Sequence, residues 1–279
     1  MRKLTLRVPE GSLNTMTASC LRHSPAAVLC AVLLLAARTA AGADATTTFS
    51  PELAPGACCA IDVRKLWPTE TAIGLKEVQR QVEEARAMSA AELHRHIHRK
   101  QAPVVIGPGG VPYLLDLHHM ARMILQVDVS PEMFVVIREN WRTLSPVEFW
   151  KRMQERNWVY LNDEVGHGPI APANLPKTIR AMRDDPYRSL AWAVRAKHGY
   201  ADAATRYSDF QWANFFRTRI PDTTVHESFD EAVTNALALA RSDAAKDLPG
   251  FVPPAAAAAP VESPVAQPDA APAVPPSNP

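Results

Sequence analysis

The chain has 279 residues, of which 47% are hydrophobic and 21% are charged, and its formal net charge is +1. These values are typical of a globular protein with one fair-sized domain or two small ones. They exclude a collagenous, coiled-coil or wholly disordered chain.

The first feature along the chain is an apolar run of 12 residues, Ala26–Ala37. This run is shorter than the ~20 residues that a helix needs to cross a bilayer. Arg22 precedes it and small residues follow it, which is typical of a signal peptide. We therefore predict that residues 1–43 are a signal peptide cleaved after Ala43, with cleavage after Ala45 as the second choice. The protein would then be exported, periplasmic or secreted, with no transmembrane segment after cleavage.

Removing this leader reverses the sign of the net charge. Residues 1–43 carry five basic residues and one acidic residue, a net charge of +4, so subtraction from +1 leaves −3 for the rest. DNA-binding domains normally have a basic surplus, because phosphate contacts supply most of their affinity. Tight binding to chromosomal DNA is therefore not expected.

Two cysteines, Cys58 and Cys59, remain in the chain after the leader. Neighbouring cysteines seldom pair with each other because the ring would close under strain. Two alternatives stay open, a pair of free thiols in a short segment and a disulfide to another chain.

The C-terminal end is rich in proline and alanine. Residues 247–279 contain ten of the 25 prolines and nine alanines. Such a stretch cannot bury enough apolar surface to offset its ordering entropy. We predict a disordered tail over 246–279, a spacer that contacts a partner or a surface. A flexible lead-in over 44–59 and one folded domain over 60–245 complete the organisation.

Apolar periodicity and turn residues predict a mixed α/β first half. Helices are expected at 75–88, 90–99 and 118–126, and strands at 60–66, 103–106, 113–116 and 133–138, with residues 67–70 as a turn. A Gly/Pro cluster at 107–110 makes the two middle strands a hairpin. The second half is mostly helical, with helices that start near Ser145, Asp185, Ser208 and Glu227.

The most informative short stretch is Asp116-Leu117-His118-His119, where a predicted strand ends and a helix begins. The first N–H groups of a helix are unpaired and attract anions. Histidines at this place can bond a phosphate and transfer a proton, and Arg122 lies one turn further on. The structural alternative is that Asp116 caps the helix and the histidines are ordinary polar residues.

These residues resemble the Asp-x-His-His signature of the ParB-like nuclease family, within the wider ParB/sulfiredoxin superfamily. The resemblance covers about residues 60–220. Other matching segments are Asp62–Thr69, Pro103–Pro108, Leu144–Trp150, Asp184–Leu190 and Phe210–Arg217. Many matches in the same order are more specific than one four-residue motif.

The resemblance implies an α/β fold of the α+β type, with a small mixed sheet, flanking helices and a helical C-terminal half. It also implies a phosphate or nucleotide at the strand-turn-helix. Kinase-like relatives have Asp-Gly-His-His-Arg, whereas this chain has Leu117 and Met120 in place of the Gly and the Arg. The catalytic Cys of sulfiredoxins, which precedes their His-Arg pair, has no counterpart here.

A carboxylate is the second candidate that the resemblance indicates. Kinase-like relatives place an acidic residue after a Pro-x pair, where it acts as base on a hydroxyl, and Pro68-Thr69-Glu70 matches that placement. A carboxylate within reach of a hydroxyl can serve as general base in phosphoryl transfer. The structural alternative for Glu70 is a solvated turn residue.

Two charged motifs have a simpler structural interpretation. His94 and His98 have the i,i+4 spacing of some zinc sites, but they flank core positions and are expected on a solvated helix face. Asp185 is expected to cap a helix and Arg188 to pair back to Asp184, although these charges could also reach the mouth of the site.

The sequence thus predicts a nuclease or a phosphoryl-transfer enzyme that binds a small phosphate-containing ligand or nucleotide. The predicted catalytic residues are Glu70, His118 and His119, and the predicted phosphate-binding residues are Asp116, His118, His119 and Arg122. The cofactor is not specified, with Mg²⁺ or another divalent ion as the candidate, and Asp116 would orient a histidine or a metal. The alternative function is a non-catalytic binding module with the same fold.

Overall fold

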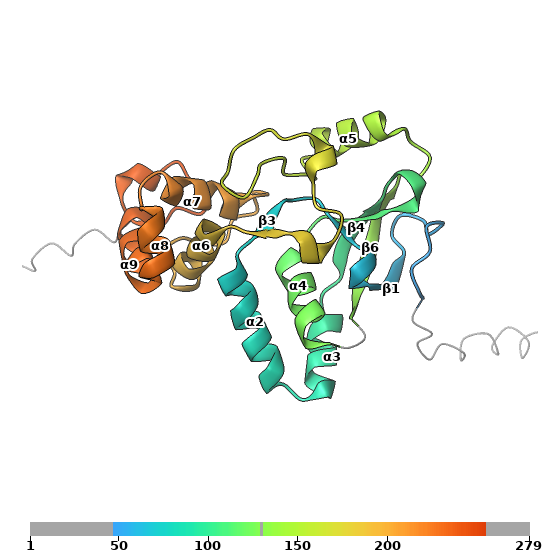
Figure 1. The fold of residues 1–279 in the computed structure, drawn as a ribbon, viewed down its shortest axis with the longest axis horizontal. Coiled ribbons are helices and arrows are strands. Elements are labelled where there is room, and N and C mark those ends of the chain that lie inside the picture. The colour runs from blue at the N-terminus through green and yellow to red at the C-terminus, as the bar shows by residue number, and fades with distance from the viewer. Residues whose placement is uncertain (1–46, 129–130, 255–279) are drawn as a thin grey trace, which may run out of the picture. The chain divides into compact units, whose positions relative to one another are not determined.

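The computed structural model describes residues 47–128 and 131–254 (Figure 1). The predicted signal peptide over 1–43 lies outside the described residues, as does the Pro/Ala-rich stretch over 255–279. Within the described ranges, no helix combines the length and apolar character that a membrane span requires.

A five-stranded sheet forms the first half of the structure. Its strands are β1 (Cys58–Asp62), β2 (Trp67–Pro68), β4 (Ala102–Ile106), β5 (Pro112–Leu114) and β6 (Glu132–Asn140), in the order β1-β6-β4-β5-β2. The pairs β1–β6 and β4–β5 are antiparallel, and the pairs β4–β6 and β5–β2 are parallel. The predicted small mixed sheet and the predicted hairpin β4–β5 are confirmed.

Helices cover both faces of this sheet. The helices α2 (Leu75–Ala87), α3 (Ala90–His98) and α4 (His118–Val127) lie on one side, and α5 (Pro146–Glu155) lies on the other (Figure 1). Successive residues of β4 point to opposite faces, as the pleat requires. Val104 and Ile106 therefore enter the core with α2 and α4, whereas Val105 enters the core with α5.

The second half is a helical layer with its own core. It contains α6 (Pro186–Ala196), α7 (Ser208–Arg217), α8 (Asp222–Glu227) and α9 (Phe229–Ala240). A two-stranded parallel pair, β3 (Ala72–Ile73) with β7 (Arg183–Asp184), joins the chain after β2 to the chain before α6. The sequence did not reveal this pair, because two residues are too few for a periodic pattern. The pair sets α6 beside the start of α2.

Three predicted elements have different bounds. The strand predicted at 60–66 ends at Asp62, whose carboxylate accepts a hydrogen bond from the N–H of Arg64 and starts a 3-10 turn over Val63–Lys65. The expected turn after it contains β2. The last predicted helix, from about Glu227 to Ser242, is α9, and the sequence did not predict the short helix α8 that ends just before it at Glu227.

The folded unit extends beyond both predicted ends. Residues 47–57, expected as a flexible lead-in, are bonded to the sheet, and the side-chain amide of Asn140 donates to the carbonyls of Pro51 and Leu53. At the other end, the indole N–H of Trp212 donates to the Pro249 carbonyl, and Phe251 packs on the helical core. The domain therefore runs from about residue 47 to about residue 251.

Candidate functional site

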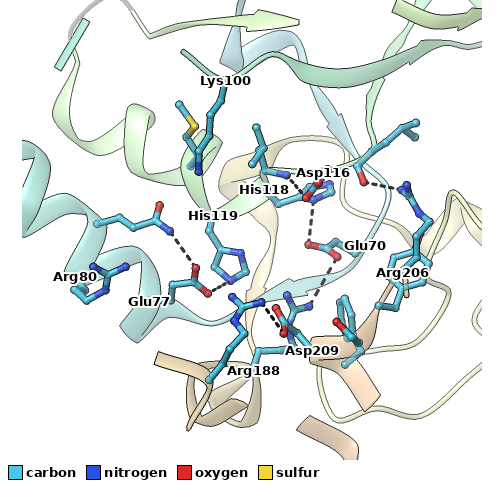
Figure 2. Close-up of a pocket in the computed structure, with 18 of the residues that line it drawn as sticks. Glu70, Glu77, Arg80, Lys100, Asp116, His118, His119, Arg188, Arg206 and Asp209 are labelled. Atoms are coloured by element: carbon cyan, nitrogen blue, oxygen red, sulfur yellow. Dashed lines mark hydrogen bonds and ion pairs between the residues drawn. The ribbon is translucent and has the colours of Figure 1, made fainter. Parts of the chain in front are cut away.

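A cavity of about 640 Å³ lies where α2, α4, α6 and the start of α7 meet. Side chains from all four elements line it, and Figure 2 shows Glu70, Glu77, His118 and His119 around the same space. The cavity therefore combines the predicted Asp-x-His-His segment with residues of the helical half.

The N-terminus of α4 opens into the cavity without a side-chain cap. Its N-cap residue, Leu117, has a left-handed backbone (φ 64°) and gives no capping bond. The N–H groups of His118, His119 and Met120 belong to the first turn, where a helix offers no internal acceptor. Glycine adopts this left-handed conformation without steric cost, so Leu117 occupies a position that suits glycine.

The N-terminus of α7 opens into the same cavity in the same way. Its N-cap residue, Tyr207, is also left-handed (φ 60°) and also makes no side-chain capping bond. Thr205, Arg206 and Ser208 line the cavity beside it. Two uncapped helix ends therefore direct N–H groups and positive dipole ends toward one space, which favours an anion.

His118 is held by hydrogen bonds at both ring nitrogens. Its Nδ1 lies 3.1 Å from Oε1 of Glu70, and its Nε2 accepts from the N–H of Thr69 at 3.4 Å. An acceptor at Nε2 assigns the proton of the neutral ring to Nδ1, which donates to Glu70. The structure therefore brings Glu70 and His118 together, and Glu70 is buried rather than a solvated turn residue.

Arg188 of α6 is the second partner of Glu70. Its Nη1 lies 3.8 Å from Oε2 of Glu70, and its guanidinium lies 3.6 Å from the ring centre of Phe210. Burial by itself would raise the pKa of Glu70, but the contacts with His118 and Arg188 outweigh it and hold that pKa at about 2. Glu70 is therefore ionised at neutral pH.

The expected pair of Arg188 with Asp184 is wrong. Asp184 accepts instead from the N–H of Leu75, at the start of α2. Asp185 caps α6 as predicted and also forms an ion pair with Arg217 at 2.7 Å. Arg188 is thereby free to turn toward the cavity, which is the alternative that the sequence left open.

His119 caps a helix other than its own. Its Nε2 accepts from the N–H of Gly74 at 3.0 Å, in front of α2. Burial, followed by the positive charge of Arg188, lowers the pKa of His119 to about 3, so the ring is neutral at pH 7. Among the described contacts its Nδ1 has no hydrogen-bond partner, which leaves this N–H available to a ligand.

Glu77, in the first turn of α2, lies beside His119. Its Oε2 is 3.3 Å from Nε2 of His119, and Oε1 accepts from the Gln81 amide at 3.1 Å. Burial raises the pKa of Glu77 to about 7, against the opposing charge of Arg188. Glu70 and Glu77 thus differ widely in proton affinity. His118 and Arg188 stabilise the charged form of Glu70, whereas burial favours the neutral form of Glu77.

The structure places the remaining two predicted residues differently. Asp116 lines the cavity, and its carboxylate accepts from the N–H of Leu117 at 2.6 Å. The carboxylate that faces His118 is that of Glu70. Arg122 does not line the cavity, since its guanidinium donates to the backbone carbonyls of Ile179 and Arg180 on the other side of α4.

Polar atoms without partners mark the cavity wall. Nη1 of Arg188, Nε of Arg206 and the hydroxyl of Tyr207 are buried and have no hydrogen-bond partner within the part of the chain that the structure describes. Unpaired buried donors are uncommon in folded proteins and are costly. These three groups line the cavity together, so an anionic ligand would satisfy them.

No metal centre is visible among the residues that the structure describes, since they hold no group of three or more suitable ligands. The rings of His94 and His98 stack on each other at 3.6 Å, and His98 rests on Phe134 at 4.0 Å, which is away from the cavity. His94 is exposed as expected, and His98 is half-buried.

Sequence reasoning missed Glu77, Arg206 and Tyr207, and it set Arg188 aside. The only signal for Glu77 was an acidic residue in the first turn of a helix, which is common in any helix. Arg206 and Tyr207 belong to the segment before α7, for which no role was predicted. Each reaches the site through packing of distant segments.

Comparisons with known proteins agree with the fold. The model of a family described as "Putative ParB-like nuclease" matches residues 59–218. The crystal structure of protein Atu1540 from Agrobacterium tumefaciens is similar, with 34% identity and a TM-score of 0.65 over 71% of this chain and 99% of that chain. A search of curated proteins found no match.

Proposed function

Because the chain belongs to the ParB-like nuclease family, we propose that its cavity binds a phosphate ester and that the protein hydrolyses it. The ligand class is a small phosphate-containing molecule, a nucleotide or a short nucleic-acid segment. The phosphate would lie against the N-termini of α4 and α7.

One observation carries this proposal. Arg188 is only 6% exposed, its Nη1 has no hydrogen-bond partner in the described structure, and it lines the space where the two uncapped helix ends meet. Leaving such a donor unpaired costs about 1–3 kcal/mol or more. A phosphate oxygen would remove that cost and bond the helix N–H groups as well.

The predicted residues take distinct roles in this proposal. Nδ1 of His119 and the side chain of Arg206 would donate to the phosphate, with Asp116 at the rim. His118 uses both ring nitrogens inside the protein, so it would position Glu70 rather than bind the ligand. Glu70, the predicted base, would in turn hold Arg188.

A non-catalytic binding module is the second candidate. The observation that favours it is the low pKa of Glu70, since a carboxylate that binds protons so weakly is a poor general base near neutral pH. The absence of Arg at position 120, where kinase-like relatives have it, favours the same candidate. Hydrolysis of a phosphate ester needs only water as its second substrate, whereas a kinase reaction needs a nucleoside triphosphate.

Export is part of the proposal, supported by the leader-like pattern over residues 1–43. Nucleoside triphosphates are scarce outside the cytoplasm, which favours hydrolysis over a kinase reaction. Cell fractionation combined with N-terminal sequencing tests it. A mature protein that begins near residue 44 in the exported fraction is expected, and an intact cytoplasmic chain contradicts export.

Ligand-induced thermal stabilisation tests the binding site. The panel contains ADP, ATP, CTP, pyrophosphate and a thymidine dinucleotide, each with and without Mg²⁺ or Zn²⁺. A ligand at one hundred times its Kd stabilises the folded state by about 2.7 kcal/mol, which raises Tm by about 5–10 °C in a domain of this size. Arg206→Gln should remove the shift, whereas Arg241→Gln, an exposed position outside the cavity lining, should keep it.

Each outcome has a definite meaning. A shift that Arg206→Gln abolishes supports the cavity as the phosphate site. Stabilisation that persists in this variant places the ligand elsewhere. No shift with any ligand contradicts phosphate binding. Hydrolysis of the bound ligand separates the enzyme from the binding module.

A further inference from the structure

The carboxyl group of Glu77 faces the cavity without a paired cation. The side chain is 13% exposed, lines the cavity and accepts from Gln81. Within the described residues the one basic side chain in contact with its carboxyl is the neutral ring of His119, whereas Glu70 also contacts Arg188. Glu77 is therefore the less restrained of the two buried carboxyls.

The bonding of His119 favours a proton on Glu77. The lone pair of Nε2 already accepts from the N–H of Gly74, so an ionised Glu77 would hold its negative oxygen 3.3 Å from an acceptor. Protonating the carboxyl removes its negative charge and with it that repulsion. Burial acts in the same direction and raises the pKa of Glu77 to about 7. Both protonation states are therefore populated at neutral pH.

Charged or titratable groups from four helices face Glu77. They are Arg80 on α2, His119 on α4, Arg188 and Arg195 on α6, and Asp209 on α7. Arg80 forms an ion pair with Glu84, and Arg195 forms one with Asp209, so these charges are largely balanced. Arg188 is shared with Glu70. Burial therefore decides the proton affinity of Glu77.

We propose that Glu77, rather than Glu70, is the general base of this cavity and takes the proton from the water that attacks a bound phosphodiester. The inference rests on the proposed function. The water oxygen forms a bond to phosphorus, the bond from phosphorus to the leaving oxygen breaks with its electron pair, and the water proton moves to Oε2 of Glu77. The leaving oxygen then takes a proton from solvent or from Glu77.

The geometry separates the two carboxyls by role. Glu70 accepts a hydrogen bond from His118 at one oxygen and forms an ion pair with Arg188 at the other, so both of its oxygens are engaged. Glu77 has one oxygen on Gln81 and the other beside a neutral ring, and it can change its protonation state without leaving a charged partner unpaired. A general base needs that freedom.

Proton-linked binding gives a test that does not require turnover. The probe is a thymidine dinucleotide, whose phosphodiester keeps its single negative charge through neutral pH. Calorimetric titrations in buffers of different ionisation enthalpy measure proton uptake. An anion beside Glu77 raises its proton affinity, so wild type should take up about half a proton per ligand slightly above pH 7.

Three variants show which side chain takes up the proton. Glu77→Gln should bind the dinucleotide without proton uptake, Glu77→Asp should retain uptake, and Glu83→Gln, on the exposed face of α2, should match wild type. His96 also lines the cavity and is the other side chain that could take up the proton. Uptake that persists in Glu77→Gln, or none in wild type, overturns the role of Glu77 and leaves the phosphate site intact.

Hydrolysis of bis(p-nitrophenyl) phosphate supplies the kinetic test. Glu77→Gln should lower kcat by about 10²–10⁴ with little change in dinucleotide affinity, and the wild-type rate should rise with pH through about 7. Rates within tenfold of wild type overturn the inference. If pyrophosphate binds and the dinucleotide does not, the phosphodiester assignment fails while phosphate binding stands. If no panel ligand binds, the proposed function itself fails.

Discussion

Replacing Glu70 with Gln removes one buried charge and changes the shape of the side chain little. The carboxylate lies 3.1 Å from His118 and 3.8 Å from Arg188, and its pKa is about 2 instead of 4.5. A shift of one unit corresponds to about 1.4 kcal/mol, so the ionised form stabilises the folded state by about 3 kcal/mol at pH 7. We expect Glu70→Gln to lose that amount.

The sign of the pH dependence follows from the lowered pKa. The stabilisation is complete well above pH 4.5, where both states are ionised, and it disappears as pH falls through 4.5 toward 2. The difference between wild type and Glu70→Gln should therefore shrink from about 3 kcal/mol at pH 7 to about half of that at pH 3. The variant mimics the protonated acid, so the two curves converge.

Urea unfolding followed by circular dichroism measures this difference across the pH range. Glu83→Gln is the matched control, because Glu83 is exposed and should change the free energy of unfolding by less than about 0.5 kcal/mol. A Glu70→Gln difference below about 1 kcal/mol at pH 7, or one that stays constant down to pH 3, would refute the conclusion that its contacts with His118 and Arg188 hold Glu70 ionised.

Three further predictions concern Glu77 and the residues that hold α2 and α6 in place. The pKa of Glu77 is raised from 4.5 to about 7, so the free energy of unfolding of wild type should fall by up to about 3 kcal/mol as pH rises from 4.5 through 7. Glu77→Gln should remove this fall, and unfolding curves between about pH 5 and 9 measure it. Asp185→Ala should destabilise the fold by about 3 kcal/mol, since it removes both the cap of α6 and the partner of Arg217, and chemical denaturation at pH 7 measures it; a cost under 1 kcal/mol would contradict this account. Gly74→Ala would place a Cβ 2.7 Å from the backbone N of Ser189, so Tm should fall by several degrees, and an unchanged Tm would mean that α2 and α6 can separate freely.

Local chemistry accounts for what could be predicted from the sequence. Ser89, Ser145 and Asp185 each bond an N–H within three residues along the chain, so the helix starts that they mark are the same in the sequence and in the structure. The hairpin β4–β5 also depends on a local signal, the Gly/Pro turn between its two strands. Family motifs added the mixed sheet and the importance of Glu70 and His118, which lie 3.1 Å apart.

Tertiary packing decided what surrounds those two residues. The strand pair β3–β7 sets α6 against α2, and this places Arg188 at Glu70 rather than at Asp184. The uncapped start of α7 reaches the cavity in the same way. Two-residue strands and left-handed N-caps leave no periodic pattern, and the proton affinity of Glu77 depends on burial by other segments. The sequence by itself determined the helix starts and the family, because their signals are short-range. Only the folded chain determined which carboxyl is charged and which can exchange a proton, because that depends on contacts between residues far apart in the chain.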